Sequence, residues 1–132
     1  TLGKVVTFKL GGTGVIKETD LPVTDRVTTA QAFGDDEVLA DGTVLYARNC
    51  MVCHGPLAIS SGVLPDLRWS SIAASAEAWS DVVLEGKLAD NGMVSFADYL
   101  TPEDAESIRA YVILQARNDM SERNEASAAP TP

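Results

Sequence analysis

The pattern of apolar positions predicts a first helix over about residues 38–49. Its apolar side chains recur at roughly helical spacing; they are Val38, Leu39, Leu45 and Tyr46. Gly42 lies inside this segment, where a glycine costs on the order of 1 kcal/mol of helix stability relative to alanine. A glycine at this position predicts that another backbone comes close to the helix.

Two further helices are predicted nearer the C-terminus. The first follows Ser75, whose hydroxyl suits an N-cap, and runs to about Glu85. The second is capped by Thr101 and ends near Arg117. Residues 87–100 between them carry no sustained period, so we expect an irregular segment with short turns. The apolar stripe of the last helix consists of Ala105, Ile108, Tyr111 and Val112.

Three segments lie outside the predicted helical domain of residues 38–117. Residues 3–10 partly alternate and are rich in β-forming side chains, which predicts one strand without an evident partner. Within residues 1–37, the stretch 11–37 carries Gly, Pro, Thr and Asp without a period, which predicts an extended connector. Residues 118–132 are polar with several Ala and Pro, which predicts a disordered tail.

Composition and charge narrow the possible functions. The 132 residues fit one domain, and the net charge of −9 argues against a surface that binds nucleic-acid phosphates. No apolar run is long enough to cross a bilayer. The chain begins with Thr1 and shows no signal-peptide pattern, so we expect a mature or trimmed piece. Aromatic residues make up only 6% of the chain, so a core built from polypeptide alone is short of large rings.

All the cysteine and histidine of the chain lies in one short motif, Cys50-Met51-Val52-Cys53-His54. Cys-x-x-Cys-His is the attachment signature of c-type haem. Two cysteines on one turn of backbone reach the two vinyl-derived carbons of a porphyrin, and the following imidazole then meets the iron. Covalent haem is therefore the favoured interpretation, and the macrocycle would supply the missing apolar bulk of the core.

The motif has three other possible interpretations. A structural zinc site needs four ligands, and the chain has no second Cys or His cluster. A thioredoxin-like redox pair needs the N-terminus of a helix in a βαβ setting, whereas this pair follows a helix. The third is a chance pattern in an ordinary domain. All three stay open as alternatives to haem.

The second axial ligand of such a haem has to be a residue other than histidine, because the chain has only one. A methionine thioether is the common alternative. Met51 lies between the attachment cysteines and cannot reach the opposite face, and Met120 lies in the predicted tail. Met93, in the irregular segment before the last helix, is therefore the expected ligand. The alternative is that Met93 only packs in the core.

These residues resemble class I cytochromes c. The segment Gly42-x-x-x-Tyr46 is similar to the family signature on the N-terminal helix, and Ile108-x-x-Tyr111 is similar to its counterpart on the C-terminal helix. The resemblance implies an all-α cytochrome c fold of three to four helices around one covalent haem c, with the two helices crossing near the glycine. It also implies that the Pro65 carbonyl accepts a hydrogen bond from the ligating imidazole; a plain turn proline is the alternative.

The chain resembles most closely the C-terminal haem c domain of PQQ-dependent quinohaemoprotein alcohol dehydrogenases. The similarity runs through the haem motif, residues 62–68 and residues 92–96. The resemblance implies that residues 3–10 are the last strand of a PQQ-binding β-propeller, whose PQQ and calcium sites lie outside this chain. It further implies that Arg68 lies near a haem propionate, although a solvated surface arginine is as plausible.

The resulting functional expectation is electron transfer by a single haem ligated by His54 and Met93. In this interpretation the chain takes electrons from a PQQ dehydrogenase domain and passes them to a soluble redox protein or to a membrane quinone chain, with no catalysis of its own. Haem c attachment predicts export to the bacterial periplasm. A free-standing periplasmic cytochrome c shuttle is one alternative. A gas-sensing haem domain and a thiol-disulfide oxidoreductase are alternatives of other classes.

Overall fold

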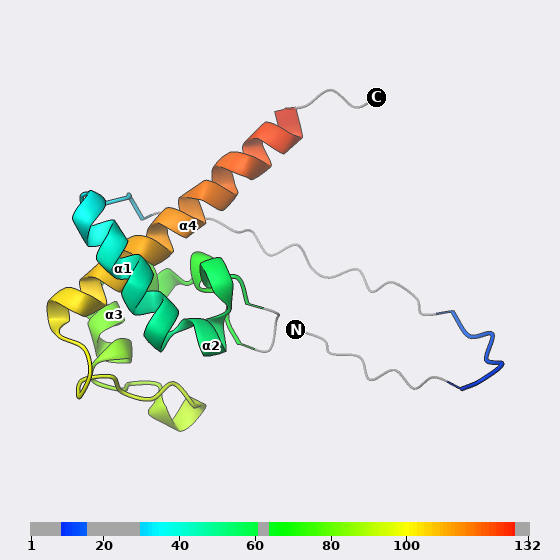
Figure 1. Cartoon of the computed structure of the whole chain (residues 1–132), viewed down its shortest axis with the longest axis horizontal. Coiled ribbons are helices and arrows are strands. Elements are labelled where there is room, and N and C mark those ends of the chain that lie inside the picture. Colours follow the sequence, from blue (N-terminus) through cyan, green and yellow to red (C-terminus); the bar gives the residue numbers. More distant parts are fainter. Residues whose placement is uncertain (1–8, 16–29, 61–63, 129–132) are drawn as a thin grey trace.

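The computed structural model describes residues 9–15, 30–60 and 64–128, and every regular element within them is a helix. The α-helices are α1 (Asp36–Asn49), α2 (Met51–His54), α3 (Ala76–Val83) and α4 (Pro102–Ala128) (Figure 1). Short 3-10 helices connect them: η1 (Pro56–Ala58), η2 (Leu67–Trp69), η3 (Ser71–Ala74) and η4 (Ala89–Asn91). The predicted all-α fold class is confirmed.

The helix α1 begins two residues earlier than the apolar spacing predicted. Asp35 is its N-cap, and the side-chain Oδ1 of Asp35 accepts a hydrogen bond of 3.0 Å from the backbone N–H of Val38. Asp36 and Glu37 occupy the first turn, where acidic side chains face the positive end of the helix dipole. Apolar periodicity misses this start because all three residues are acidic.

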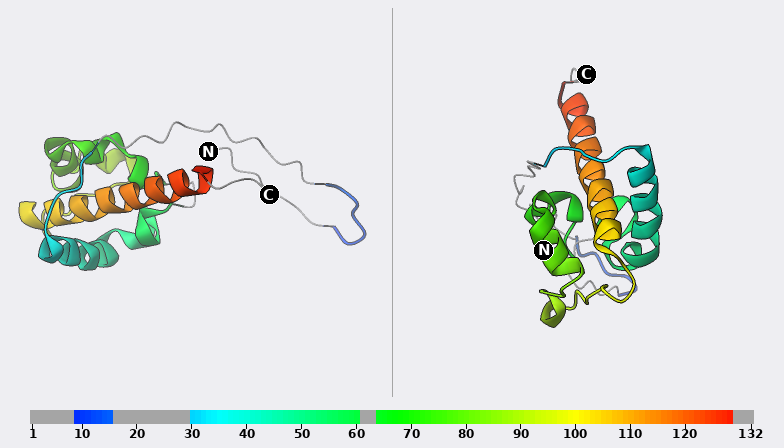
Figure 2. Two further views of the ribbon diagram at one scale, coloured as in Figure 1. Left: turned by 90° about the horizontal axis from the view of Figure 1, so that it is seen from above. Right: turned by 90° about the vertical axis from the view of Figure 1, so that its left-hand side faces the viewer.

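The crossing of α1 and α4 forms the centre of the fold (Figures 1 and 2). Gly42 lies at the crossing, where an added Cβ would come within 2.0 Å of the Ser107 carbonyl oxygen. One turn further along α1, the ring of Tyr46 packs on that of Tyr111, with ring centroids 4.9 Å apart. The predicted close approach of a second backbone at Gly42 is therefore confirmed.

The helix α3 covers the same core from another side. Ser75 caps it as predicted, because its hydroxyl accepts a hydrogen bond of 3.2 Å from the Ala78 N–H. Trp79 and Val83 are buried on its inner face. The indole N–H of Trp79 donates to the Ala105 carbonyl at 2.8 Å, which ties α3 to the first turn of α4. Trp79 is therefore a core residue.

The helix α4 begins at its predicted start and runs past its predicted end. Thr101 and Asp104 bond reciprocally at its N-terminus, since the Asp104 N–H donates to the Thr101 hydroxyl and the Thr101 N–H donates to the Asp104 carboxylate. The helix then continues to Ala128, so the prediction of a disordered tail from residue 118 is wrong for residues 118–128. Residues 129–132 lie outside the described residues.

Two kinds of contact explain the longer helix. Asp119 pairs with Arg123 one turn later, and the same carboxylate pairs with Arg68 from a distant part of the chain. An i,i+4 ion pair supports an exposed helix, and a tertiary ion pair fixes it against the body of the domain. The last turns, red in Figure 1, extend beyond the other helices.

The last residues of the predicted connector, from residue 30 onward, lie against α4. The Phe33 ring lies 4.3 Å from the Arg109 guanidinium, and Arg117 donates to the Ala30 carbonyl at 3.5 Å. The predicted strand falls mainly on residues 1–8, outside the described residues.

Residues 87–100 are irregular apart from η4 and a turn at residues 97–99, as expected. None of the helices in the described part of the chain combines the length and the apolar character that a bilayer crossing requires.

Candidate functional site

The two cysteines and the histidine lie on one turn of backbone where α1 passes into α2. Cys50 ends α1, and its N–H donates to the Tyr46 carbonyl at 2.9 Å. The N–H of His54 donates to the Cys50 carbonyl at 2.9 Å, which closes the turn. Cys50 is half-buried and Cys53 is exposed, and no disulfide joins them. Two sulfurs and one imidazole therefore lie in a single compact turn, as the spacing predicted.

The imidazole of His54 is buried beside a backbone carbonyl. His54 is only 8% exposed, and its Nδ1 lies 3.4 Å from the Pro65 carbonyl oxygen. A proton on Nδ1 donates to that oxygen and leaves Nε2 as the nitrogen that can bind a metal. The structure thus brings Pro65 to His54, and the role of Pro65 beside a ligated imidazole stays a prediction.

A tight reversal of the chain follows His54. Gly55 has a φ of 74°, and an added Cβ would lie 2.1 Å from the Ile59 carbonyl oxygen. Leu57 and Ala58 also have positive φ values, of 56° and 61°. The conformation is stabilised from α1, because the Tyr46 hydroxyl donates to the Gly55 carbonyl at 2.7 Å. The reversal allows the following loop to pass beside the imidazole.

Burial also governs the acid–base properties of this turn. Burial, with a smaller contribution from the neighbouring Cys53, raises the pKa of the Cys50 thiol to about 12. Burial likewise raises the pKa of the Tyr46 phenol, with Cys50 as the next contributor. Both groups are therefore neutral at physiological pH in the haem-free turn.

Met93 lies in the loop between η4 and α4. Its N–H donates to the Leu88 carbonyl at 3.2 Å, and its side chain is half-buried against the same core cluster that Cys50 contacts. By contrast, Met51 is exposed on α2, and Met120 lies on α4 rather than in a tail. The assignment of Met93 as second axial ligand stays a prediction.

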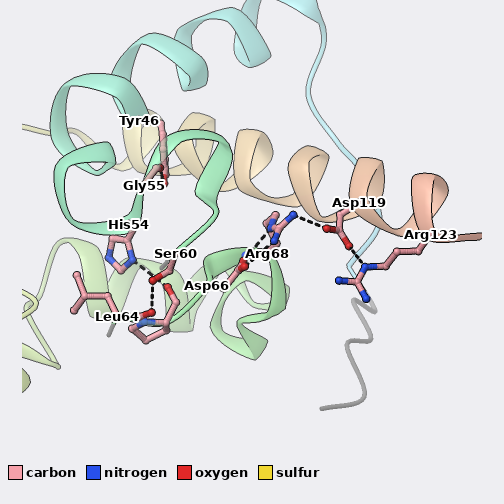
Figure 3. A network of polar contacts seen from close by, with 10 residues as sticks. Tyr46, His54, Gly55, Ser60, Leu64, Asp66, Arg68, Asp119 and Arg123 are labelled. Atoms are coloured by element: carbon pink, nitrogen blue, oxygen red, sulfur yellow. Dashed lines mark hydrogen bonds and ion pairs between the residues drawn. The ribbon is translucent and has the colours of Figure 1, made fainter. Parts of the chain in front are cut away.

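Arg68 is held by two carboxylates in the structure. Its Nη2 lies 2.7 Å from Asp66 Oδ2, and its Nη1 lies 2.5 Å from Asp119 Oδ1 (Figure 3). Hydrogen bonding to Asp66, with the charge of both carboxylates, raises the pKa of Arg68 above its ordinary value. The solvated surface arginine considered above does not describe this side chain, which is 10% exposed. A contact with a haem propionate stays a prediction.

The surroundings of the motif fit a large apolar group. Several apolar side chains near the motif and in the Met93 loop are exposed: Met51, Val52, Leu57, Ile59, Leu64 and Val94. A porphyrin bound through the two cysteines would cover apolar surface of this kind. Within residues 9–15, 30–60 and 64–128, no group of three or more His, Cys, Asp or Glu side chains is arranged to hold a metal ion. Two cysteines and one imidazole on a single turn match the donor set of a c-type haem.

Two further residues support the site and were not singled out from the sequence. The place of Asp66 directly after Pro65 is the sequence signal that could have found it. Asp119 lay in a segment predicted to be disordered. Its i,i+4 spacing to Arg123 was the one available sign that this segment is helical.

Comparison with protein families gives one matching model. The model is described as cytochrome C oxidase, cbb3-type, subunit III, and it matches residues 37–112, which is more than half of the chain. The match begins in the first turn of α1 and ends inside α4, so it spans the whole turn of Cys50, Cys53 and His54. It also contains the loop with Met93.

Comparison with curated proteins finds quinone-dependent alcohol dehydrogenases. The quinohemoprotein alcohol dehydrogenase ADH IIB of Pseudomonas putida is 41% identical over 103 residues, which are 78% of this chain and 15% of that protein. ADH-IIG of the same organism is 36% identical over 115 residues, covering 87% of this chain and 16% of the relative. The dehydrogenase subunit of the alcohol dehydrogenase (quinone) of Gluconobacter oxydans (strain 621H) is 38% identical over 92 residues. This chain therefore spans about a sixth or less of the length of each of these relatives.

Proposed function

Because the chain belongs to the cytochrome c family of the cbb3-type subunit III model and is homologous to cytochrome c domains of quinohaemoprotein alcohol dehydrogenases, we propose that it transfers electrons through one covalent haem c. In this proposal Cys50 and Cys53 would carry the thioether bonds to the haem. His54 and Met93 would be the two protein ligands of the iron. The family implies electron transfer in general, and these assignments specify how this chain performs it.

One observation carries the proposal. Cys50, Cys53 and His54 share a single turn, in which the imidazole is buried with Nδ1 toward a carbonyl oxygen. When bound, a haem c supplies an Fe(II)/Fe(III) couple that gains and loses one electron at a time. The turn fixes the direction of the imidazole, and the Pro65 carbonyl selects the tautomer that leaves Nε2 free to ligate.

Met93 and the core side chains around it would give the iron its second protein ligand and apolar surroundings. Met93 supplies a thioether from a loop that already packs against the core. With two protein ligands on the iron, a substrate would have no open position, so the proposal assigns no oxidation of alcohol to the chain itself. Its residues instead set how easily the iron is reduced, through ligand type, burial and the hydrogen bond to His54.

The curated relatives suggest which proteins donate electrons to this domain and accept electrons from it. Their names describe quinone-dependent alcohol dehydrogenases, and this chain corresponds to only part of each. We propose a PQQ dehydrogenase domain as the electron donor and a soluble redox protein or a membrane quinone chain as the acceptor. The net charge of −9 favours a partner with a basic docking surface. We propose the bacterial periplasm as the location of the chain, because haem c is attached to exported proteins.

The raised pKa of Cys50 argues against thiol–disulfide chemistry at this residue. A catalytic thiol needs a lowered pKa, because the thiolate is the nucleophile. Burial instead raises the pKa of Cys50 to about 12. A free-standing periplasmic cytochrome c shuttle is the second candidate function for this chain. It would hold the haem through the same residues and would differ only in its electron donor.

A redox titration with methionine variants tests the ligand assignment. In the haem-bearing chain, Met93→Ala should lower the reduction potential and abolish the six-coordinate low-spin spectrum, because a thioether ligand favours Fe(II). Met120→Ala, on α4, is the matched control and should leave both unchanged. An unchanged potential and spectrum in Met93→Ala would contradict the assignment of Met93.

A further inference from the structure

A run of ion pairs links α4 to the loop that carries Pro65. Arg68 lies between the two carboxylates of Asp66 and Asp119, so that the loop and the helix share one guanidinium (Figure 3). We propose that Asp119, through Arg68, is a positioning residue that holds the Pro65 carbonyl beside the imidazole. This inference rests on the proposed function, in which that imidazole ligates the iron.

The loop side of this link is a rigid fork. Arg68 Nε lies 3.0 Å from Asp66 Oδ1, and Nη2 lies 2.7 Å from Oδ2. The backbone N–H of Arg68 donates to the same Oδ1 at 3.1 Å. Three hydrogen bonds thus fix the turn at η2, and Pro65 is joined directly to the residue that accepts them. In this proposal a movement of the fork would shift the Pro65 carbonyl.

The helix side anchors the fork to α4. The two oxygens of Asp119 are divided between two arginines, with Arg68 Nη1 at 2.5 Å and Arg123 Nε at 2.5 Å. The side chains of Arg68 and Asp119 are only 10% and 15% exposed. Charge-assisted bonds with little exposure to solvent are stronger than surface ion pairs. The anchor therefore joins the loop to α4 through bonds that solvent screens little.

The position of the Pro65 carbonyl matters for the iron because this carbonyl accepts a hydrogen bond from the imidazole of His54. A hydrogen bond from Nδ1–H gives the imidazole more anionic character and makes it a stronger donor to the metal. A stronger donor stabilises Fe(III) relative to Fe(II) and so lowers the reduction potential. The distance from Nδ1 to the carbonyl oxygen is 3.4 Å, a length at which small shifts change the strength of the bond considerably. Loosening the loop should therefore raise the potential.

The test compares Asp119→Asn with a charge-matched control in the haem-bearing chain. Asn keeps the shape and one acceptor but removes the charge, so the fold should be kept. Glu122→Gln removes one negative charge from an exposed position on the same helix. Two quantities are measured: the hydrogen-exchange rate of the His54 Nδ1 proton by NMR in the reduced state, and the reduction potential.

We expect Asp119→Asn to accelerate exchange of that proton by about tenfold and to raise the potential. Asp119→Glu should return both toward the wild-type values, because it restores the carboxylate. Arg68→Lys should act in the same direction as Asp119→Asn, because a lysine cannot form the fork with Asp66. Glu122→Gln should change neither quantity.

Equal exchange rates and potentials in Asp119→Asn and Glu122→Gln would overturn the inference, even if Asp119→Asn unfolds at a lower temperature. A lower potential in Asp119→Asn would overturn it as well. Failure of the proposed function would look different, since the wild-type chain itself would then lack a covalently attached, low-spin haem. The two failures are therefore distinguishable.

Discussion

The Tyr46 hydroxyl on α1 donates a hydrogen bond of 2.7 Å to the carbonyl of Gly55, directly after His54. The bond spans the whole Cys-x-x-Cys-His turn, from the last part of α1 to the chain reversal. Tyr46 is almost fully buried and packs its ring on Tyr111 of α4. One side chain therefore connects the crossing of the two long helices to the turn that carries the proposed haem attachment.

Tyr46→Phe should lower the free energy of unfolding by about 1 to 2 kcal/mol, because it leaves the Gly55 carbonyl without its hydrogen bond in a partly buried place. Urea unfolding of the haem-bearing chain measures this. Tyr99→Phe is the control, since Tyr99 is 78% exposed and should tolerate loss of its hydroxyl. Equal stabilities for the two variants would show that the bond to Gly55 contributes nothing.

Stability should fall at alkaline pH because of the same phenol. Burial raises the pKa of Tyr46 above its ordinary value of 10.0, so the folded chain keeps the proton while the unfolded chain loses it. The stabilisation is complete below pH 10 and is lost as pH rises further, by up to about 1.4 kcal/mol per pH unit. Urea unfolding between about pH 9 and 11 should show this slope. It should be smaller in Tyr46→Phe, and Tyr111, whose pKa burial also raises, should retain part of it.

Gly42→Ala should destabilise the fold by about 3 kcal/mol, because the new Cβ would lie 2.0 Å from the Ser107 carbonyl oxygen. The overlap forces α1 and α4 apart and outweighs the gain in helix propensity, which is about 1 kcal/mol. Gly14→Ala is the control, since no atom lies within 4 Å of a Cβ added there. Thermal unfolding of both variants decides the matter, and a Gly42→Ala protein as stable as the wild type would refute the tight crossing.

Arg109→Gln should cost about 1 to 2 kcal/mol of stability, because Arg109 joins three parts of the chain. Its guanidinium bonds Glu106, donates to the Ala73 carbonyl at 3.1 Å and lies 4.3 Å from the Phe33 ring. Arg48→Gln, at an exposed position, is the matched control. A double-mutant cycle with Phe33→Leu isolates the contact to the connector, and a coupling energy of zero would show that this contact does not stabilise it.

The starts of α3 and α4 were predictable from the sequence because they depend on local chemistry. Ser75 and Thr101 cap α3 and α4 through bonds to residues three positions ahead. The close approach at Gly42 was also predictable, since an interior glycine is unfavourable unless another backbone needs the space. Such signals lie within one turn of the element they describe.

The end of α4 was not predictable from periodicity, because residues 118–128 have no apolar stripe. The helix there is supported by the contact between Asp119 and Arg68, which lie far apart in the sequence. The observed partners of Arg68 are two carboxylates of the chain itself, whereas the resemblance implied a haem propionate. The placement of Cys50, Cys53 and His54 on one turn, in contrast, was predictable from their spacing alone.

The visible absorption spectrum of the purified chain tests the central claim most directly. The oxidised and dithionite-reduced protein would be recorded before and after acid–acetone extraction, with a Cys50→Ala, Cys53→Ala double variant as control. We predict sharp reduced bands of a low-spin haem c, with colour that stays on the wild-type polypeptide and is absent from or extracted from the double variant. A colourless wild-type chain after correct maturation, or colour that is extracted from it, would contradict covalent haem attachment.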